Sequence, residues 1–137
     1  MSLFIDTSVF YAAADSGDPR NGRAKEILGG DESLVLSDHV LVECWLLIRT
    51  RMGRAAAQRF WHAARDGGAR LEMVLPDDLE AAWSIARGFE DQDFSLVDLT
   101  SFAVMLRLGI QRAASFDHHF VIFRFGRGRK RAFEVVR

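Results

Sequence analysis

A chain of 137 residues with a net charge of −1 is about the size of one domain and can bury a core. Its composition, 49% hydrophobic and 27% charged, excludes a disordered chain and predicts a globular one. No apolar run is long enough to cross a bilayer, the N-terminus lacks the features of a signal peptide, and one cysteine excludes a disulfide framework or a multi-cysteine zinc site. We therefore expect one domain over residues 1–137, located in the cytoplasm.

Short apolar runs alternate with longer helical patterns along this chain. The predicted strands span residues 2–6, 33–37, 71–75 and 112–116, with two further short candidates at 121–125 and 132–136. The predicted helices span residues 7–14, 20–28, 38–52, 54–66, 76–87 and 95–108, and Asp38 is expected to cap the third of them. This alternation predicts an α/β fold, a single-domain parallel sheet with helices on both faces.

The charge is distributed unevenly. Residues 124–137 carry six basic residues and one acid, whereas the rest of the chain carries 12 basic and 18 acidic residues. A protein that separates its acids from its bases is suited to bind a metal ion and a polyanion together. A charge run by itself favours a solvated, flexible tail, so both interpretations are open at this point.

Four acidic residues each interrupt or end an apolar stretch: Asp6, Glu43, Asp98 and Asp117. A carboxylate in apolar surroundings is costly unless a cation, a proton or hydrogen bonds compensate its charge. Asp6 and Asp117 end predicted strands, and Asp98 lies in the first turn of a predicted helix. Ligands bind beyond the carboxyl ends of parallel strands, so the four acids are expected to share one crevice around a divalent metal.

Three of these acids also have an ordinary structural explanation. Asp6 suits the N-cap of the next helix, Asp98 forms a capping box with Ser95, and Asp117 suits a turn. Glu43 is harder to explain in this way because its neighbours from 40 to 48 are apolar. For Glu43 the alternative is a buried salt bridge to Arg49 or Arg51.

Four motifs in order resemble those of PIN-domain nucleases. They are Phe4-Ile5-Asp6-Thr7-Ser8-Val9, then Val42-Glu43, then Asp93-Phe94-Ser95-Leu96-Val97-Asp98, and finally Ser115-Phe116-Asp117-His118-His119-Phe120. Their spacing covers nearly the whole chain and is most similar to VapC-type toxins of bacterial toxin–antitoxin pairs. The resemblance implies a PIN-like three-layer sandwich, a metal-dependent ribonuclease, a homodimer, and a cognate antitoxin protein as partner.

Oxygen ligands suit Mg²⁺ or Mn²⁺, and hydrolysis of an RNA phosphodiester bond needs the metal to neutralise charge and activate water. We expect Asp6 and Asp98 to be the principal ligands, with Glu43 and Asp117 completing the site. Thr7 and Ser115 are candidates for hydrogen bonds that orient these ligands. His118 and His119 are expected in an exposed turn.

RNA affinity depends on neutralising phosphates. The candidate contacts are Arg49, Arg51, Arg124, Arg127, Arg129, Lys130 and Arg131. Three large apolar residues, Phe60, Trp61 and Trp83, are expected to be too many for one small core and therefore favour a dimer.

Other functions are less consistent with the sequence. A phosphotransferase of the haloacid dehalogenase type carries a second Asp two positions after the first, where this chain has Ser8. A receiver domain needs a late lysine after a strand, and neither Lys25 nor Lys130 has that setting. A housekeeping RNA-processing nuclease and a non-catalytic RNA-binding or antitoxin-binding module of the same fold stay open as alternatives.

Overall fold

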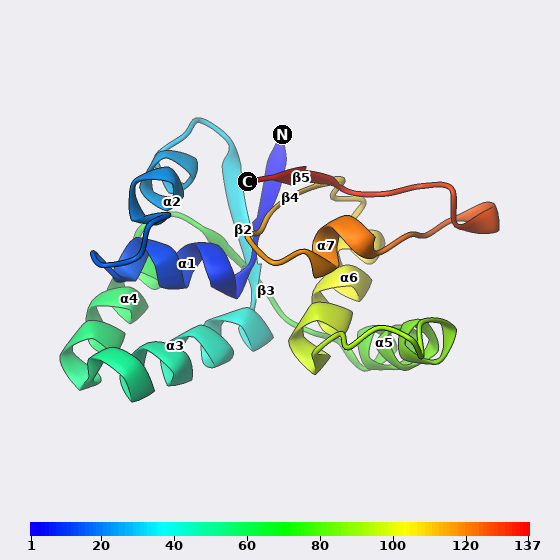
Figure 1. The fold of residues 1–137 in the computed structure, drawn as a ribbon, viewed down its shortest axis with the longest axis horizontal. Coiled ribbons are helices and arrows are strands. Elements are labelled where there is room, and N and C mark those ends of the chain that lie inside the picture. Colours follow the sequence, from blue (N-terminus) through cyan, green and yellow to red (C-terminus); the bar gives the residue numbers. More distant parts are fainter.

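The computed structural model describes residues 1–137 and contains one five-stranded, fully parallel sheet in the order β3-β2-β1-β4-β5 (Figure 1). The strands are β1 (Ser2–Ile5), β2 (Ser33–Ser37), β3 (Arg70–Glu72), β4 (Arg112–Ala114) and β5 (Glu134–Val136). The helices are α1 (Thr7–Ala14), α2 (Asn21–Leu28), α3 (Asp38–Met52), α4 (Arg54–Asp66), α5 (Pro76–Gly88), α6 (Leu96–Leu108) and α7 (His119–Ile122), and a 3₁₀ turn follows at Arg127–Arg129.

The helices cover both faces of the sheet, as predicted. In Figure 1, α1 to α4 lie on one side and α5 to α7 on the other. The central strand β1 is buried from Leu3 to Ile5 because it pairs with β2 and β4 and has helices on both faces. The apolar run from Leu3 to Ile5 therefore fits a central parallel strand, which is covered on both faces. None of the helices combines the length and apolar character needed to span a membrane.

The predicted cap of α3 was wrong by one residue. Ser37 is the N-cap, and its hydroxyl accepts a hydrogen bond from the Val40 N–H at 3.1 Å. Asp38 lies inside the helix, and its carboxylate accepts from the Val74 N–H at 2.8 Å. Asp38 therefore ties α3 to the segment that enters α5.

A strand was also predicted at 121–125, and this prediction was wrong because residues 119–122 form the short helix α7. Phe120 and Phe123 are three residues apart, so one helical turn points both rings at the same target. That target is Phe102 of α6, whose ring centroid lies 4.9 Å from Phe120 and 4.3 Å from Phe123. This aromatic cluster fixes the loop after β4 against α6.

The C-terminal basic segment is folded rather than a solvated tail. Phe125 and Arg131 pair as an antiparallel bridge and close a short loop, which projects over the α5 side in Figure 1. The Arg129 guanidinium donates to the Gly88 carbonyl at 2.6 Å and lies over the Phe89 ring. The chain then returns to the sheet as β5, a shorter strand than the predicted 132–136.

The three aromatic residues expected at a dimer surface are placed differently. Phe60 belongs to the core, where its ring packs at 5.5 Å from Phe10. Trp61 on α4 and Trp83 on α5 are exposed, but these helices lie at opposite ends of the molecule (Figure 1). One interface therefore cannot use all three.

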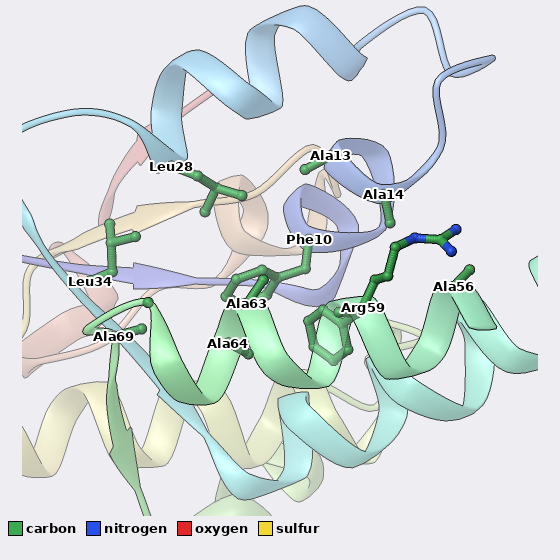
Figure 2. Close-up of a pocket in the computed structure, with 12 residues that line it drawn as sticks. Phe10, Ala13, Ala14, Leu28, Leu34, Ala56, Arg59, Ala63, Ala64 and Ala69 are labelled. Carbon is green, nitrogen blue, oxygen red and sulfur yellow. The ribbon is translucent and has the colours of Figure 1, made fainter. Parts of the chain in front are cut away.

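An apolar pocket of about 390 Å³ opens between α1, α2 and α4 (Figure 2). Phe10, Leu28, Leu34 and a series of alanines line it, and Arg59 of α4 is its single charged residue. Figure 2 shows the Arg59 side chain extending along the rim toward Ala14. The pocket contains no acidic residue, so it is not the crevice predicted from the sequence.

Candidate active site

Asp6 follows β1 directly and caps α1. Its Oδ2 accepts hydrogen bonds from the Ser8 hydroxyl at 2.7 Å, the Ser115 hydroxyl at 2.8 Å and, more weakly, the Ser8 N–H at 3.4 Å. The side chain is nearly enclosed, with 4% of its residue surface exposed. A carboxylate is therefore held at the carboxyl end of the central strand by three donors of no net charge.

The environment of Asp6 disfavours its negative charge. The pKa of Asp6 is raised from an ordinary value of 3.8 to about 6, because burial and, to a smaller extent, the Asp98 carboxylate raise it by more than the hydrogen bonds from Ser8 and Ser115 lower it. The charge of Asp98 thus disfavours the charge of Asp6. A cation between them would remove both penalties.

Asp98 lies in the first turn of α6 and is also buried, with 5% exposed. Its Oδ2 accepts from the Ser95 N–H at 3.0 Å, while the Ser95 hydroxyl accepts from the Asp98 N–H at 3.0 Å. This is the capping box expected from the sequence. A second donor reaches the same oxygen, because His119 Nδ1 lies 2.8 Å from Oδ2.

Asp117 joins the same cluster through Ser115 and His119. The Ser115 hydroxyl, which donates to Asp6, also accepts from the Asp117 N–H at 3.0 Å. Asp117 Oδ1 accepts from the His119 N–H at 2.9 Å and lies 3.4 Å from His119 Nδ1. Hydrogen bonds thus connect three carboxylates that are up to 111 positions apart in the sequence.

Each of the three carboxylates uses one oxygen for these contacts and leaves the other one without a protein donor. All hydrogen bonds to Asp6 and Asp98 go to Oδ2, and those to Asp117 go to Oδ1. The buried side-chain polar atoms that lack a hydrogen-bond partner are Thr7 Oγ1 and Ser101 Oγ. The free carboxylate oxygens are not among them, so these oxygens are accessible to solvent. Each of the three carboxylates therefore keeps one oxygen that is free to accept a ligand.

Glu43 lies one turn into α3 and forms no hydrogen bond or salt bridge within the chain. It is half-buried and lines an open groove together with His39, Arg51 and Val97. Burial raises the pKa of the neighbouring Cys44 thiol, and the charges of Glu43 and then Asp6 raise it further. Glu43 makes no hydrogen bond to the other three acids, and the alternative salt bridge to Arg49 or Arg51 is not formed.

None of the four acids is paired with an arginine or a lysine. The arginine–carboxylate pairs involve other residues, such as the buried Asp78 with Arg107 and Glu32 with Arg112. The capping roles of Asp6 and Asp98 are present at the same time as the cluster, so the structural and functional explanations do not exclude each other. Carboxylate oxygens that no arginine or lysine neutralises fit a divalent ion such as Mg²⁺ or Mn²⁺.

The contribution of two residues was missed from the sequence. Ser8, two positions after Asp6, takes the role expected for Thr7: the Ser8 hydroxyl bonds Asp6, whereas Thr7 Oγ1 is buried without a partner. Ser8 Oγ also accepts from the Phe116 N–H at 2.9 Å and so links α1 to the loop after β4. His119 is largely covered and bonds Asp98, contrary to the exposed turn that was expected.

The predicted RNA-contacting residues lie on two separate surfaces. Arg51 lies over the Tyr11 ring and lines the groove beside Glu43, while Arg49 lies over Trp45. In the C-terminal segment, Arg124 donates to the carbonyls of Ile122 and Phe123, and Arg131 lies over Phe125. Arg127, Arg129 and Lys130 are exposed in the loop that projects from the domain. Arg51 is the predicted contact that lines the same groove as one of the four acids.

The family of the chain follows from comparisons with known proteins. The family model described as PIN domain matches residues 3–126. The chain belongs to the PIN domain family. It is 39% identical over 119 residues to the 23S rRNA-specific endonuclease VapC20 of Mycobacterium tuberculosis strains CDC 1551 / Oshkosh and H37Rv, which covers 86% of this chain and 91% of the relative.

Solved structures extend the comparison to three dimensions. The crystal structure of M. tuberculosis VapC20, described as a sarcin-ricin loop cleaving toxin, matches with a TM-score of 0.81 and 37% identity over 87% of this chain and 92% of that one. VapBC2 of Rickettsia felis bound to a promoter DNA fragment matches with a TM-score of 0.67 at 11% identity, over 86% and 89% of the two chains, which shows the fold alone. The predicted PIN-domain nuclease of the VapC type is therefore confirmed.

Proposed function

We propose that this PIN domain is a divalent-metal-dependent endoribonuclease that hydrolyses RNA phosphodiester bonds at Asp6, Glu43, Asp98 and Asp117. The observation that carries the proposal is the set of three buried or half-buried aspartates, each with one oxygen held by the protein and one oxygen free. When bound, a Mg²⁺ or Mn²⁺ ion would neutralise the attacked phosphate and acidify the attacking water. Asp6 and Asp98 would hold it through their Oδ1 atoms.

The other residues orient Asp6, add acceptor atoms or contact the substrate. Ser8 and Ser115 hold Asp6 Oδ2, so this carboxylate keeps one orientation as substrate arrives. Asp117, fixed by its turn, adds a third acceptor at the same edge. Glu43 has no hydrogen-bond partner in the protein and is suited to accept a proton from the attacking water or to bind a second ion. Arg51, which lines the same groove as Glu43, is suited to contact the phosphate backbone.

We propose 23S rRNA, and within it the sarcin-ricin loop, as the substrate. The support is the identity of 39% with a 23S rRNA-specific endonuclease over most of both chains. The test is digestion of purified ribosomes with Mg²⁺ or Mn²⁺ and mapping of the new RNA ends by primer extension. Wild type is expected to produce one cut, while Asp98→Asn and chelated wild type produce none.

Asp66→Asn is the matched control, because Asp66 is an exposed aspartate on α4 whose neighbour is His62 rather than a site residue. It is expected to cut like wild type. Equal cutting by Asp98→Asn would overturn the active site. Cutting at other RNAs that is abolished by Asp98→Asn would retain the enzyme and the site and replace the substrate, as the housekeeping alternative requires.

We propose that the enzyme is the toxin of a toxin–antitoxin pair, supported by the description of the structural relative as a toxin. Controlled expression in a bacterial host is expected to arrest growth in wild type but not in Asp98→Asn. Co-expression of the adjacent reading frame should restore growth and yield a complex that copurifies. Normal growth of cells that contain active wild-type enzyme would contradict this role.

We also propose a homodimer formed by the face that α3, α5 and α6 share. Helix α6 packs against both α3 and α5, and the three helices expose the large apolar side chains Leu46 (54%), Trp83 (62%) and Leu96 (62%), which a partner subunit would cover. Trp83→Glu should weaken the dimer in light scattering, whereas Trp61→Glu, at the other end of the molecule, should not. A wild-type monomer at all concentrations would contradict it.

A further inference from the structure

His119 is the side chain that contacts both Asp98 and Asp117. Its Nδ1 lies 2.8 Å from Asp98 Oδ2 and 3.4 Å from Asp117 Oδ1, and its backbone N–H donates to Asp117 Oδ1 at 2.9 Å. The first contact spans from the start of α7 to the start of α6. His119 therefore connects two acids that come from separate elements.

The surroundings of His119 hold the imidazole ring in place. The side chain is 17% exposed, and the ring stands edge-on to Phe94 with centroids 5.3 Å apart. Phe94 in turn packs against Phe102 at 5.3 Å and so belongs to the aromatic cluster that fixes α7. The ring is supported from the apolar side, while its Nδ1 edge faces the two carboxylates.

The hydrogen-bond chemistry determines what His119 does to Asp98. An ionised carboxylate oxygen only accepts, so Nδ1 carries the hydrogen and donates it to Oδ2. Together with the Ser95 N–H, this gives Oδ2 two donors and leaves Oδ1 with none. The arrangement fixes the rotation of the carboxylate and directs Oδ1 away from the protein donors.

We propose that His119 is a positioning residue that presents Asp98 Oδ1, and with it the free Asp117 oxygen, to the divalent metal; this inference rests on the proposed function. The role parallels that of Ser8 and Ser115 at Asp6, where hydroxyl groups hold Oδ2. Loss of such an orienting partner typically weakens metal affinity by about 10- to 100-fold.

The test uses three substitutions at His119 and measures the Mn²⁺ dissociation constant by electron paramagnetic resonance, with folding checked by circular dichroism. His119→Asn places an amide N–H near the Nδ1 position, His119→Gln places one near Nε2, and His119→Phe keeps the packing on Phe94 but removes the donor. We expect His119→Asn to keep most of the affinity and the other two to lose about 10- to 100-fold. His62→Asn, at an exposed histidine beside Asp66, is the matched control and should equal wild type.

Unchanged affinity in a folded His119→Phe overturns the positioning role. If His119→Phe does not fold, the comparison of His119→Asn with His119→Gln decides. If His119→Gln keeps the Mn²⁺ affinity and His119→Asn loses it, the positioning role is overturned as well, because His119 would then bind the metal through Nε2. Asp98→Asn separates this inference from the proposed function. Wild-type Mn²⁺ affinity in Asp98→Asn would overturn the metal site itself. Loss of affinity in Asp98→Asn, together with wild-type affinity in the His119 variants, would overturn only the role of His119.

Discussion

The apolar pocket between α1, α2 and α4 and the acidic crevice at the carboxyl ends of β1 and β4 differ in how their lining groups are satisfied. Apart from Arg59, the pocket presents mainly methyl and aromatic groups that need no partner. The crevice presents three carboxylates that are not paired with any arginine or lysine. A search for enclosed volume therefore finds the apolar pocket, whereas a search for carboxylates without a basic partner finds the acidic crevice. The unpaired carboxylates are the better indicator of an active site.

The largest expected effect comes from removing a charge in the crevice. Asp6→Asn keeps an acceptor oxygen for Ser8 and Ser115 but removes the negative charge, so RNA cleavage should fall by roughly a thousandfold or more, as the loss of several kcal/mol of metal stabilisation implies. Initial rates on a synthetic RNA hairpin at saturating Mg²⁺ measure it. A loss of less than about threefold would mean that Asp6 is only a helix cap.

This prediction relies on a fold that the sequence largely revealed. Apolar runs that end in Asp6 or precede Asp117 located the strand ends, because a buried parallel strand leaves no other place for a carboxylate. The sequence did not reveal His119, since its partner Asp98 lies 21 positions away and only the packing of α7 on α6 brings them together. The Ser8 hydroxyl had a signal in its spacing of two from Asp6, but Thr7 has the same chemistry one position earlier.

Residues 121–125 were assigned to the wrong element for a related reason. A short apolar run fits a strand or a buried helical turn equally well. The contact with Phe102 favours the helical turn, because the helical spacing brings both Phe120 and Phe123 against its ring. Local propensity was overruled by a long-range aromatic contact.

The pH dependence of metal affinity is the next effect in size. The pKa of Asp6 is raised to about 6 by burial and by Asp98, so a proton competes with the metal below that pH. Mn²⁺ affinity should be nearly constant above pH 7 and fall by up to about tenfold per unit below pH 6. Titrations from pH 5 to 8 test this, and a flat profile would place the metal away from Asp6. A metal site in the apolar pocket, which has no acidic residue, would not show this pH dependence.

A third effect concerns stability without metal. Because the folded-state pKa of Asp6 is raised from 3.8 to about 6, the folded form binds the proton more tightly than the unfolded chain. Stability from this group is complete below pH 4, is lost as the pH rises toward 6, and is lower by up to about 3 kcal/mol above that.

Asp6→Asn removes this charge, so in the presence of a chelator it should be more stable than wild type at pH 8 and nearly equal at pH 4. Urea denaturation at the two pH values measures the difference. A variant less stable than wild type at pH 8 would mean that the cluster is not strained by its charges.

The smallest expected effect is in the apolar pocket. Ala63→Leu fills space that is open between α1, α2 and α4, distant from the carboxylates, so Mn²⁺ affinity and cleavage rate should stay within about twofold of wild type. Side-by-side assays with Asp6→Asn make the contrast. A large loss of cleavage in Ala63→Leu would show that the two regions are coupled and would weaken the separation drawn between them.

The most direct test of the convergent carboxylates is the anomalous scattering of a crystal soaked in Mn²⁺. The account predicts one strong peak or a close pair, with Oδ1 of Asp6 and Oδ1 of Asp98 at roughly 2.0–2.3 Å from an ion, as expected for small hard cations. A saturated crystal with no peak beside these two oxygens, or with its peak elsewhere on the molecule, would contradict it.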